Sequence, residues 1–246
     1  KKSSGHVPYQ ESPTRARNKA IAHYSKELGK RTMGMSGADI AKVINEAIIH
    51  AAKAKKNVID WDDLNFALDY TSLGPMKRMK IISDEQKRIV AYHETGHALV
   101  AYLLPCATNP TKVSIVPRGN SMLGFSQSVP EEEKKLFSKQ EMIDHMHVLI
   151  AGRVAERIKF KSITTGASDD LERLTRSARD LVMRYGMDEQ FGSMVVLSEH
   201  QYSDETLHSI DKQVQTVIAT IEREVEALLH KHLASFEAIA TLLFEK

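Results

Sequence analysis

The stretch that decides the fold lies between residues 83 and 105 and reads SDEQKRIVAYHETGHALVAYLLP. Ser83 and Gln86 have the spacing of a capping box at a helix N-terminus. Pro105 ends the helical pattern, because proline cannot continue a helix. The segment is therefore predicted to form one helix, with a cluster of polar residues enclosed by apolar ones.

That polar cluster has the spacing H-E-x-x-H, formed by His93, Glu94 and His97. Residues four apart lie one above the other on a helix, so both imidazoles can bind the same ion. Zinc accepts imidazole ligands, and at catalytic sites it keeps a position open for water, whose pKa falls to about 7. Glu94 can reach that water and act as the general base. The motif predicts a zinc-dependent endopeptidase.

Two surface histidines on an ordinary amphipathic helix would give the same letters. The setting argues against this alternative, because apolar residues both precede and follow the motif. Gly96, inside the motif, costs about 1 kcal/mol relative to Ala in a helix interior. A glycine at this position predicts that another part of the protein approaches the helix backbone closely.

A third zinc ligand must come from elsewhere, because Leu103 stands where the metzincin motif requires a histidine. Asp170 precedes Leu174 by four residues and shares the apolar face of its predicted helix, whereas Asp169 is rotated by about 100°. A carboxylate on a core-facing side needs a partner or a metal ion. Asp170 is the predicted ligand, and Glu156, at the flank of another buried helix, is the alternative.

The rest of the chain predicts a mostly α protein with one small β-hairpin, formed by residues 112–116 and 123–128. We predict a tail over 1–14, a small helical module over 15–72, a linker over 73–82 and the peptidase domain over 83–246. Helices are expected over about 15–28, 36–57, 60–72, 83–105, 139–159, 168–185 and 204–231, with a last one around Phe236.

Three of these expectations concern details of the helices. Ser36 and Asp60 are predicted to cap the second and third helices, and Ile48 belongs to the apolar stripe of the second. Tyr185 is placed on the buried face of the helix that begins near residue 168. The helices after residue 204 carry long apolar stripes with few evident partners in a domain of this size, which predicts burial against another helix or subunit.

Composition narrows the function classes. The 246 residues are 42% hydrophobic, enough for a packed core, and a net charge of +2 is not that of a nucleic-acid-binding protein. The single cysteine, Cys106, excludes an internal disulfide and a cysteine-rich zinc site. No apolar run reaches the roughly 20 residues that span a bilayer.

Five stretches, taken in chain order, resemble the FtsH-type AAA metalloproteases: AYHETGHA (91–98), KVSIVPR (112–118), LGFSQ (123–127), AGRVAE (151–156) and TGASDDL (165–171). The resemblance implies that His93, His97 and Asp170 bind Zn²⁺ and that Glu94 is the base. It also implies a membrane-anchored, ATP-driven hexamer, of identical copies or with close homologues, that degrades unfolded and membrane polypeptides. Residues 34–39 look like part of an AAA lid subdomain.

The chain departs from that family pattern in lacking the P-loop sequence G-x-x-x-x-G-K-[ST]. It is therefore expected to be a lid-like module plus the protease domain, with the ATPase core and the membrane segment outside it. The wording of residues 123–127 and 164–171 is closest to the matrix-facing mitochondrial branch, which implies the mitochondrial inner membrane. The bacterial inner membrane and the plastid are the alternatives.

Two other functions fit parts of the sequence. The chain could be an assembly module of an AAA ring in which proteolysis is lost or minor, although the intact H-E-x-x-H motif argues against this. It could also be a lid-type adaptor in which the motif is a coincidence. Zinc content and cleavage that depends on Glu94 separate these alternatives from a peptidase.

Overall fold

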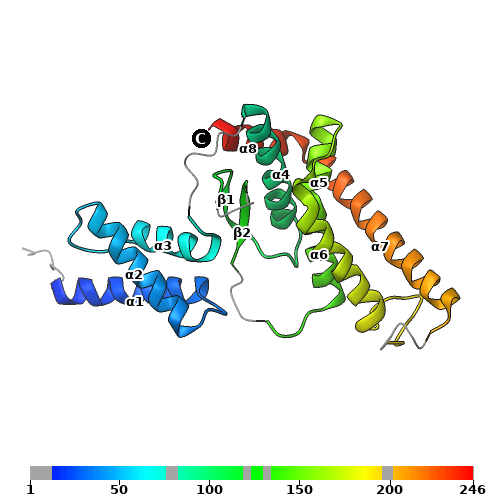
Figure 1. Cartoon of the computed structure of the whole chain (residues 1–246), viewed down its shortest axis with the longest axis horizontal. Coiled ribbons are helices and arrows are strands. Elements are labelled where there is room, and N and C mark those ends of the chain that lie inside the picture. The colour runs from blue at the N-terminus through cyan, green and yellow to red at the C-terminus, as the bar shows by residue number, and fades with distance from the viewer. Residues whose placement is uncertain (1–12, 76–82, 119–122, 130–133, 196–201, 246) are drawn as a thin grey trace, which may run out of the picture. The chain divides into compact units, whose positions relative to one another are not determined.

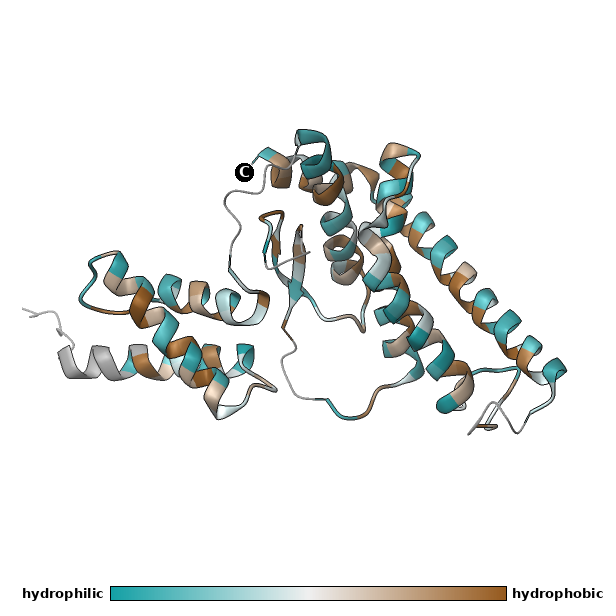
Figure 2. Cartoon of the chain, in the orientation of Figure 1, coloured by the Kyte–Doolittle hydropathy of each residue, from teal (hydrophilic) through white to brown (hydrophobic). Residues whose placement is uncertain are grey.

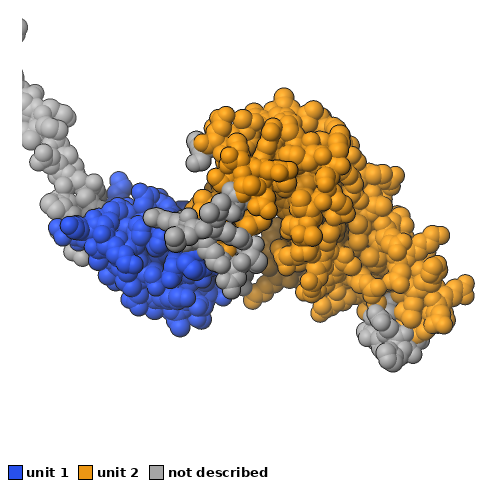
Figure 3. Space-filling model, turned by 45° about the horizontal axis from the view of Figure 1, so that its top comes forward, with its two compact units in different colours: residues 1–75, 131–133 blue, residues 76–130, 134–246 orange. Residues whose placement is uncertain are grey.

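The computed structural model describes residues 13–75, 83–118, 123–129, 134–195 and 202–245 (Figure 1). They divide into two compact units, one made of the described residues up to Pro75 and the other of those from residue 83 onward (Figure 3). Each unit has a hydrophobic core of its own, and the two cores share no residue. The predicted class, mostly α with one small hairpin, is confirmed. The predicted tail falls almost entirely outside the described residues.

The first unit consists of three helices, α1 (Pro13–Arg31), α2 (Gly37–Lys53) and α3 (Trp61–Leu73). Ser36 caps α2 and Asp60 caps α3, as predicted, and each forms a reciprocal capping box with the residue three positions on. The core between α2 and α3 is built from small and branched side chains: Val43, Ala47, Leu64, Ala67 and Leu68.

Two expectations about α2 are wrong. The helix ends at Lys53 and does not continue to Asn57, because the backbone turns out of the helical region at Lys55, with φ of 56°. Ile48, assigned to the buried stripe, is exposed. It lies one position past Ala47, which is fully buried and faces α3.

The second unit is built around two helices, α4 (Asp84–Leu103) and α5 (Lys139–Phe160), which pack closely against each other. α4 also packs on α8 (Leu233–Glu245), and α5 packs on α6 (Ser168–Arg179) and α7 (Asp204–Lys231). As predicted, α5 is central, with apolar residues buried on several faces: Met146, Leu149, Ile150, Ala151, Val154 and Ala155. The short 3-10 turn η1 (Thr165–Ala167) leads into α6.

Hydrophobic residues recur along α7 (Figure 2), and this stripe is covered within the same unit. The buried members are Ile210, Val214, Ile221, Val225 and Leu229. Ion pairs at the edge of the stripe join α7 to α5, with Arg157 contacting Glu222 and Glu226, and His147 contacting Glu224 at 2.8 Å. The predicted burial against another helix or subunit is provided for α7 by helices of its own unit.

α8 is tied to α4 through Tyr92. The ring of Tyr92 packs edge-on against Phe160 and Phe236, each at 5.4 Å between ring centroids. Its hydroxyl donates to Glu237, which also accepts from Lys159 at 2.6 Å. Three helices thus meet at the residue that precedes His93.

The predicted helix beginning near residue 168 does not run uniformly to Tyr185. After Arg179 it widens into a π-helical turn, η2 (Asp180–Arg184), in which the amide of Tyr185 donates to the carbonyl of Asp180 at 3.0 Å. The extra residue in this turn rotates the following side chains, so Tyr185 is exposed and not buried as expected.

The hairpin is shorter and shifted relative to the prediction. Its antiparallel strands are β1 (Pro110–Ser114) and β2 (Phe125–Ser128), with Ser114 paired to Phe125. An irregularity in register lies between Pro110 and Lys112. The tip, residues 119–122, and the acidic run at 131–133 lie outside the described residues. Among the helices described, none is both long and apolar enough to cross a membrane.

Candidate metal centre

Helix α4 brings its two histidines together at the face that packs on α5. The Nε2 atoms of His93 and His97 are 3.0 Å apart, and both side chains are nearly buried. Ser83 fixes the start of this helix by accepting from the amide of Gln86, as the capping pattern predicted. The four-residue spacing therefore places both imidazoles on one face, as expected from helix geometry.

Asp170 completes the cluster from the first turn of α6. Its Oδ2 atom lies 3.5 Å from Nε2 of His93 and 3.4 Å from Nε2 of His97. Asp169 is exposed and takes no part in the cluster. Of the two neighbouring aspartates, the structure thus brings to the histidines the one that the helical phase had selected. Across the described chain, this is the one group of three such side chains whose ligand atoms converge as a metal site requires.

The other ring nitrogen of each histidine is already engaged. Nδ1 of His97 lies 2.7 Å from the carbonyl oxygen of Val148, and Nδ1 of His93 lies 2.7 Å from Oε1 of Glu156. A carbonyl oxygen can only accept, so Nδ1 of His97 carries the proton, and the carboxylate of Glu156 favours the same tautomer of His93. In the neutral rings, the lone pairs of both Nε2 atoms therefore face the centre of the cluster.

Glu156 was the alternative third ligand, and the structure gives it a different place. It is buried behind His93, and its second oxygen accepts from the amide of Thr164 at 2.7 Å. Burial raises the pKa of Glu156, but the hydrogen bonds from His93 and Thr164 outweigh this and lower it. Glu156 thus contacts an imidazole, whereas Asp170 lies on the side of the two free Nε2 atoms.

The donor set fits a zinc ion. Ligands at 2.0–2.1 Å in a tetrahedron are about 3.3 Å from one another, close to the 3.0, 3.4 and 3.5 Å found between the three donor atoms. Room for an ion exists because Gly152 lacks a side chain. A Cβ at Gly152 would lie 2.5 Å from Nε2 of His93 and 2.6 Å from Nε2 of His97.

The charges around the cluster favour a cation at its centre. Burial lowers the pKa of His93, but contacts with Asp170 and Glu156 outweigh it and raise that pKa to about 9. Burial likewise raises the pKa of Asp170, and its contacts with the two histidines outweigh this and lower it. Without a metal ion, the site thus holds a proton where a cation would sit.

Glu94 lies beside this cluster and is buried. Burial raises its pKa, an effect that positive charge on His97 and His93 opposes. The backbone just before β2 presses on it, since a Cβ at Gly124 would come within 2.9 Å of both Cγ and Oε1 of Glu94. The carboxylate is therefore held close to the cluster by the hairpin as well as by its own helix.

Sequence reasoning did not identify the outer contacts of the two imidazoles or the roles of Gly124 and Gly152. A glycine in the interior of a buried helix, as at Gly152, was an available signal, because such a residue usually marks a close approach. The carbonyl of Val148 gives no signal in the side-chain sequence. Gly96 behaves as predicted, since a Cβ there would lie 2.6 Å from the carbonyl oxygen of Ala151.

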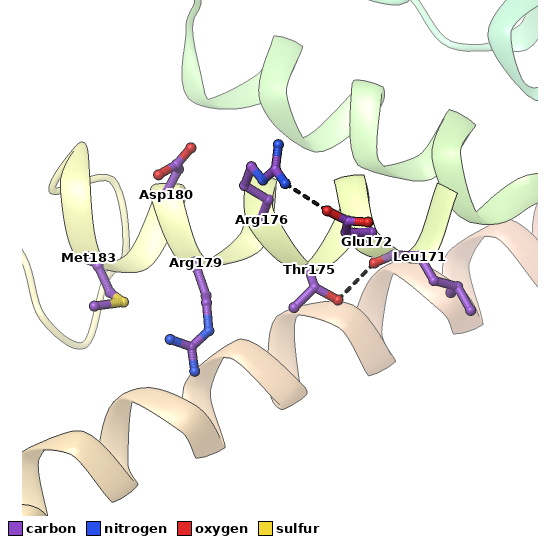
Figure 4. Close-up of a pocket in the computed structure, with 7 residues that line it drawn as sticks. All are labelled: Leu171, Glu172, Thr175, Arg176, Arg179, Asp180 and Met183. Atoms are coloured by element: carbon purple, nitrogen blue, oxygen red, sulfur yellow. Dashed lines mark hydrogen bonds and ion pairs between the residues drawn. The ribbon is translucent and has the colours of Figure 1, made fainter. Parts of the chain in front are cut away.

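A hollow lies along α6 (Figure 4) and does not include the cluster. Two contacts of its polar groups lie within the helix: Arg176 contacts Glu172 at 2.7 Å, and Thr175 donates to the carbonyl of Leu171 at 2.8 Å. A third joins Arg179 to Asp211 of α7 at 2.6 Å. The remaining residues of its lining are Asp180 and Met183. The arginines named here are paired with carboxylates, whereas the metal cluster presents three converging ligand atoms, so the cluster is the better candidate for chemistry.

Comparison with known proteins agrees with this geometry. A family described as AAA+ lid domain matches residues 25–66. Proteins named ATP-dependent zinc metalloprotease FtsH are 39% identical over 246 residues in Halothermothrix orenii, 35% over 245 in Thermotoga maritima and 40% over 229 in Rhodothermus marinus. These matches cover 94%, 94% and 89% of this chain, but only 39%, 40% and 33% of the relatives, so the chain spans about two fifths of their length or less.

The longer of the two family matches covers the unit that contains the cluster. The model of peptidase family M41 matches residues 80–246, which is more than half of the chain and includes all four predicted site residues. The resemblance to FtsH-type proteases is thereby confirmed at the level of the family, while the organisms of these relatives give no support for a mitochondrial branch in particular. The chain belongs to peptidase family M41.

Proposed function

We propose that this chain is the peptidase part of an ATP-dependent zinc metalloendopeptidase, with Zn²⁺ held by His93, His97 and Asp170. The observation that carries the proposal is the convergence of three donor atoms within about a tetrahedral edge of one another. The outward nitrogens of both imidazoles are occupied, which leaves the inward ones for a metal ion. The names of the relatives point to the same ion.

Glu94 is the proposed general base. When bound, zinc supplies Lewis acidity, which lowers the pKa of a water molecule and polarises the scissile carbonyl. Glu94 takes a proton from the attacking water as its oxygen bonds to the carbonyl carbon. It then gives that proton to the amide nitrogen as the carbon–nitrogen bond breaks, so that a free amine and a carboxylic acid result.

The proposed substrates are unfolded and membrane polypeptides, delivered by an ATPase. Two observations support coupling to such a motor: the first unit matches an AAA+ lid domain, and the relatives are named ATP-dependent. The 246 residues contain no P-loop pattern, so ATP hydrolysis is assigned to residues outside this sequence. Slow cleavage of loosely folded proteins, and none of stably folded ones, is expected of this chain alone.

The proposed cellular place is a membrane, with the mitochondrial inner membrane as the specific proposal. Its support is the amino-acid sequence of residues 123–127 and 164–171, which most resembles that of the matrix-facing mitochondrial branch. Fractionation of the source cells tests this. Recovery of the protein in a bacterial or plastid membrane would leave the peptidase proposal intact and remove the mitochondrial one.

The proposed function is tested by zinc analysis combined with casein cleavage, for this chain and for Glu94→Gln. About one zinc per chain is expected in both proteins, and cleavage by the variant should fall by roughly 10²–10⁴ because it lacks the general base. No bound zinc would favour a lid-type adaptor. Zinc without cleavage would favour an assembly module, and an active Glu94→Gln variant would refute the role of Glu94.

We further propose that the chain works in a ring of six subunits, either identical or mixed with close homologues. The support from the chain itself is now limited to α8, where Leu233, Ile239 and Leu242 are exposed. Analytical ultracentrifugation at tens of micromolar protein measures the assembly. A ring should sediment as about six chains, whereas a clean monomer would remove the proposal for this length of chain.

A further inference from the structure

Gly152 occupies an unusual place at the centre of α5. It is buried directly beneath the two histidines, and the three atoms nearest to an added Cβ are Cε1 and Nε2 of His93, at 2.5 Å, and Nε2 of His97, at 2.6 Å. Side-chain carbons do not approach other heavy atoms this closely. A methyl group at Gly152 would therefore overlap the edges of both imidazoles on the side that faces α5.

We propose that Gly152 is a positioning residue for the metal ion: its missing side chain lets the two imidazoles lie against the backbone of α5 at the spacing that the ion requires. The proposal rests on the proposed function, since it takes a metal ion as the occupant. It assigns to α5 the role of supporting both rings from one side.

The imidazoles cannot easily move aside to admit a side chain. His93 is held by Glu156 and His97 by the carbonyl of Val148, each at 2.7 Å. Rotation of either ring away from Gly152 would break its hydrogen bond and leave a buried acceptor without its donor. The outer hydrogen bonds and the glycine thus act together. They fix both rings against the backbone of α5, so that the space between the ring nitrogens suits an ion only.

Gly152 differs in this respect from Gly96, the other buried glycine at the contact between α4 and α5. A Cβ at Gly96 would meet the backbone of Ala151 and the side chain of Ala155, so that glycine serves helix packing. The three nearest neighbours of a Cβ at Gly152 all belong to the candidate ligands. Packing alone would favour alanine at this helical position, because alanine is the better helix former.

The test compares wild type, Gly152→Ala and the control Gly37→Ala, whose added Cβ would have no atom within 4 Å. Zinc affinity is measured by competition with a chromophoric chelator, and ligand geometry by the visible spectrum of the Co²⁺-loaded protein. Displacing two ligands should cost at least as much as losing an outer partner, so we expect the affinity of Gly152→Ala to fall by about 100-fold or more. Its Co²⁺ spectrum should change, while the control should match wild type.

Thermal unfolding with and without zinc separates positioning from packing. Metal-free Gly152→Ala should keep its helical circular dichroism, and zinc should raise its melting temperature by much less than it raises that of wild type. An equal rise on zinc addition, lost helicity or unchanged zinc affinity would make Gly152 a packing residue and overturn the inference. If wild type itself binds no zinc, the proposed function fails first, and the inference falls with it.

Discussion

At the scale of single residues, two neutral imidazole nitrogens that face each other at 3.0 Å, with a carboxylate beside them, repel one another unless positive charge lies between them. Neither ring can turn to reduce this repulsion without breaking a hydrogen bond, since each Nδ1 atom is hydrogen-bonded on the outer side of the cluster. A single proton between these atoms offsets only part of the repulsion. The proposed zinc ion would offset the repulsion among all three side chains in this nearly buried site.

The three acidic residues near the cluster should differ in their effect on zinc. Asp170→Ala is expected to abolish tight binding, because it removes a proposed ligand. Glu156→Ala should weaken binding by about 10–100-fold, as expected for an outer partner of a ligand. Asp169→Ala should leave binding unchanged, because that side chain is exposed. Zinc content after dialysis ranks the variants, and loss of metal in Glu156→Ala but not in Asp170→Ala would reverse the assignment of the third ligand.

Helical periodicity was enough to place the residues that contribute donor atoms. Two properties of single helices were sufficient: the spacing of His93 and His97, and the phase of Asp170 relative to Leu174. A single helix can be predicted from sequence. The roles of Glu156 and Gly152 could not be predicted from the sequence of a single helix. Their roles depend on the distance between α4 and α5, which no local pattern specifies.

At the scale of secondary-structure elements, most helices were predictable because their caps and apolar periods lie within them. The errors occur where an element departs from ideal geometry. The π-helical turn at 180–184 inserts a residue and turns Tyr185 outward. The residue types in a segment do not predict such a turn. The strands of the hairpin begin and end at other residues than predicted, and the irregularity between Pro110 and Lys112 at the start of β1 is one that strand alternation does not reveal.

The close packing of α4 on α5 predicts a large cost for a small substitution at Gly96. A methyl group there would lie 2.6 Å from the carbonyl oxygen of Ala151, which cannot move without shifting α5. Gly96→Ala is therefore expected to lower the free energy of unfolding by about 1–3 kcal/mol. Urea denaturation measures this, with Gly29→Ala as a control, because its added Cβ has no neighbour within 4 Å. Equal stability of both variants would contradict the packing role.

At the scale of the whole molecule, the two units have separate cores, and all candidate ligands belong to the second. Two thermal transitions are therefore expected, and zinc should stabilise only one. At free zinc about 100-fold above its dissociation constant, binding adds roughly 2.7 kcal/mol to the unit that binds it. Calorimetry before and after chelation should show one transition falling by several degrees and the other unmoved. A shift of both would mean that the units unfold together.

The contact between Tyr92 and the last helix has a consequence for biosynthesis. Tyr92 and Glu237 are 145 residues apart, so the ribosome makes the histidine-bearing helix long before it makes the partner that covers its neighbour. Until Phe236 and Glu237 emerge, the apolar side of Tyr92 has no cover from α8. Nascent chains are thus expected to complete the packing around Tyr92 only after Phe236 and Glu237 have left the ribosome, which delays folding of this unit until α8 has been made.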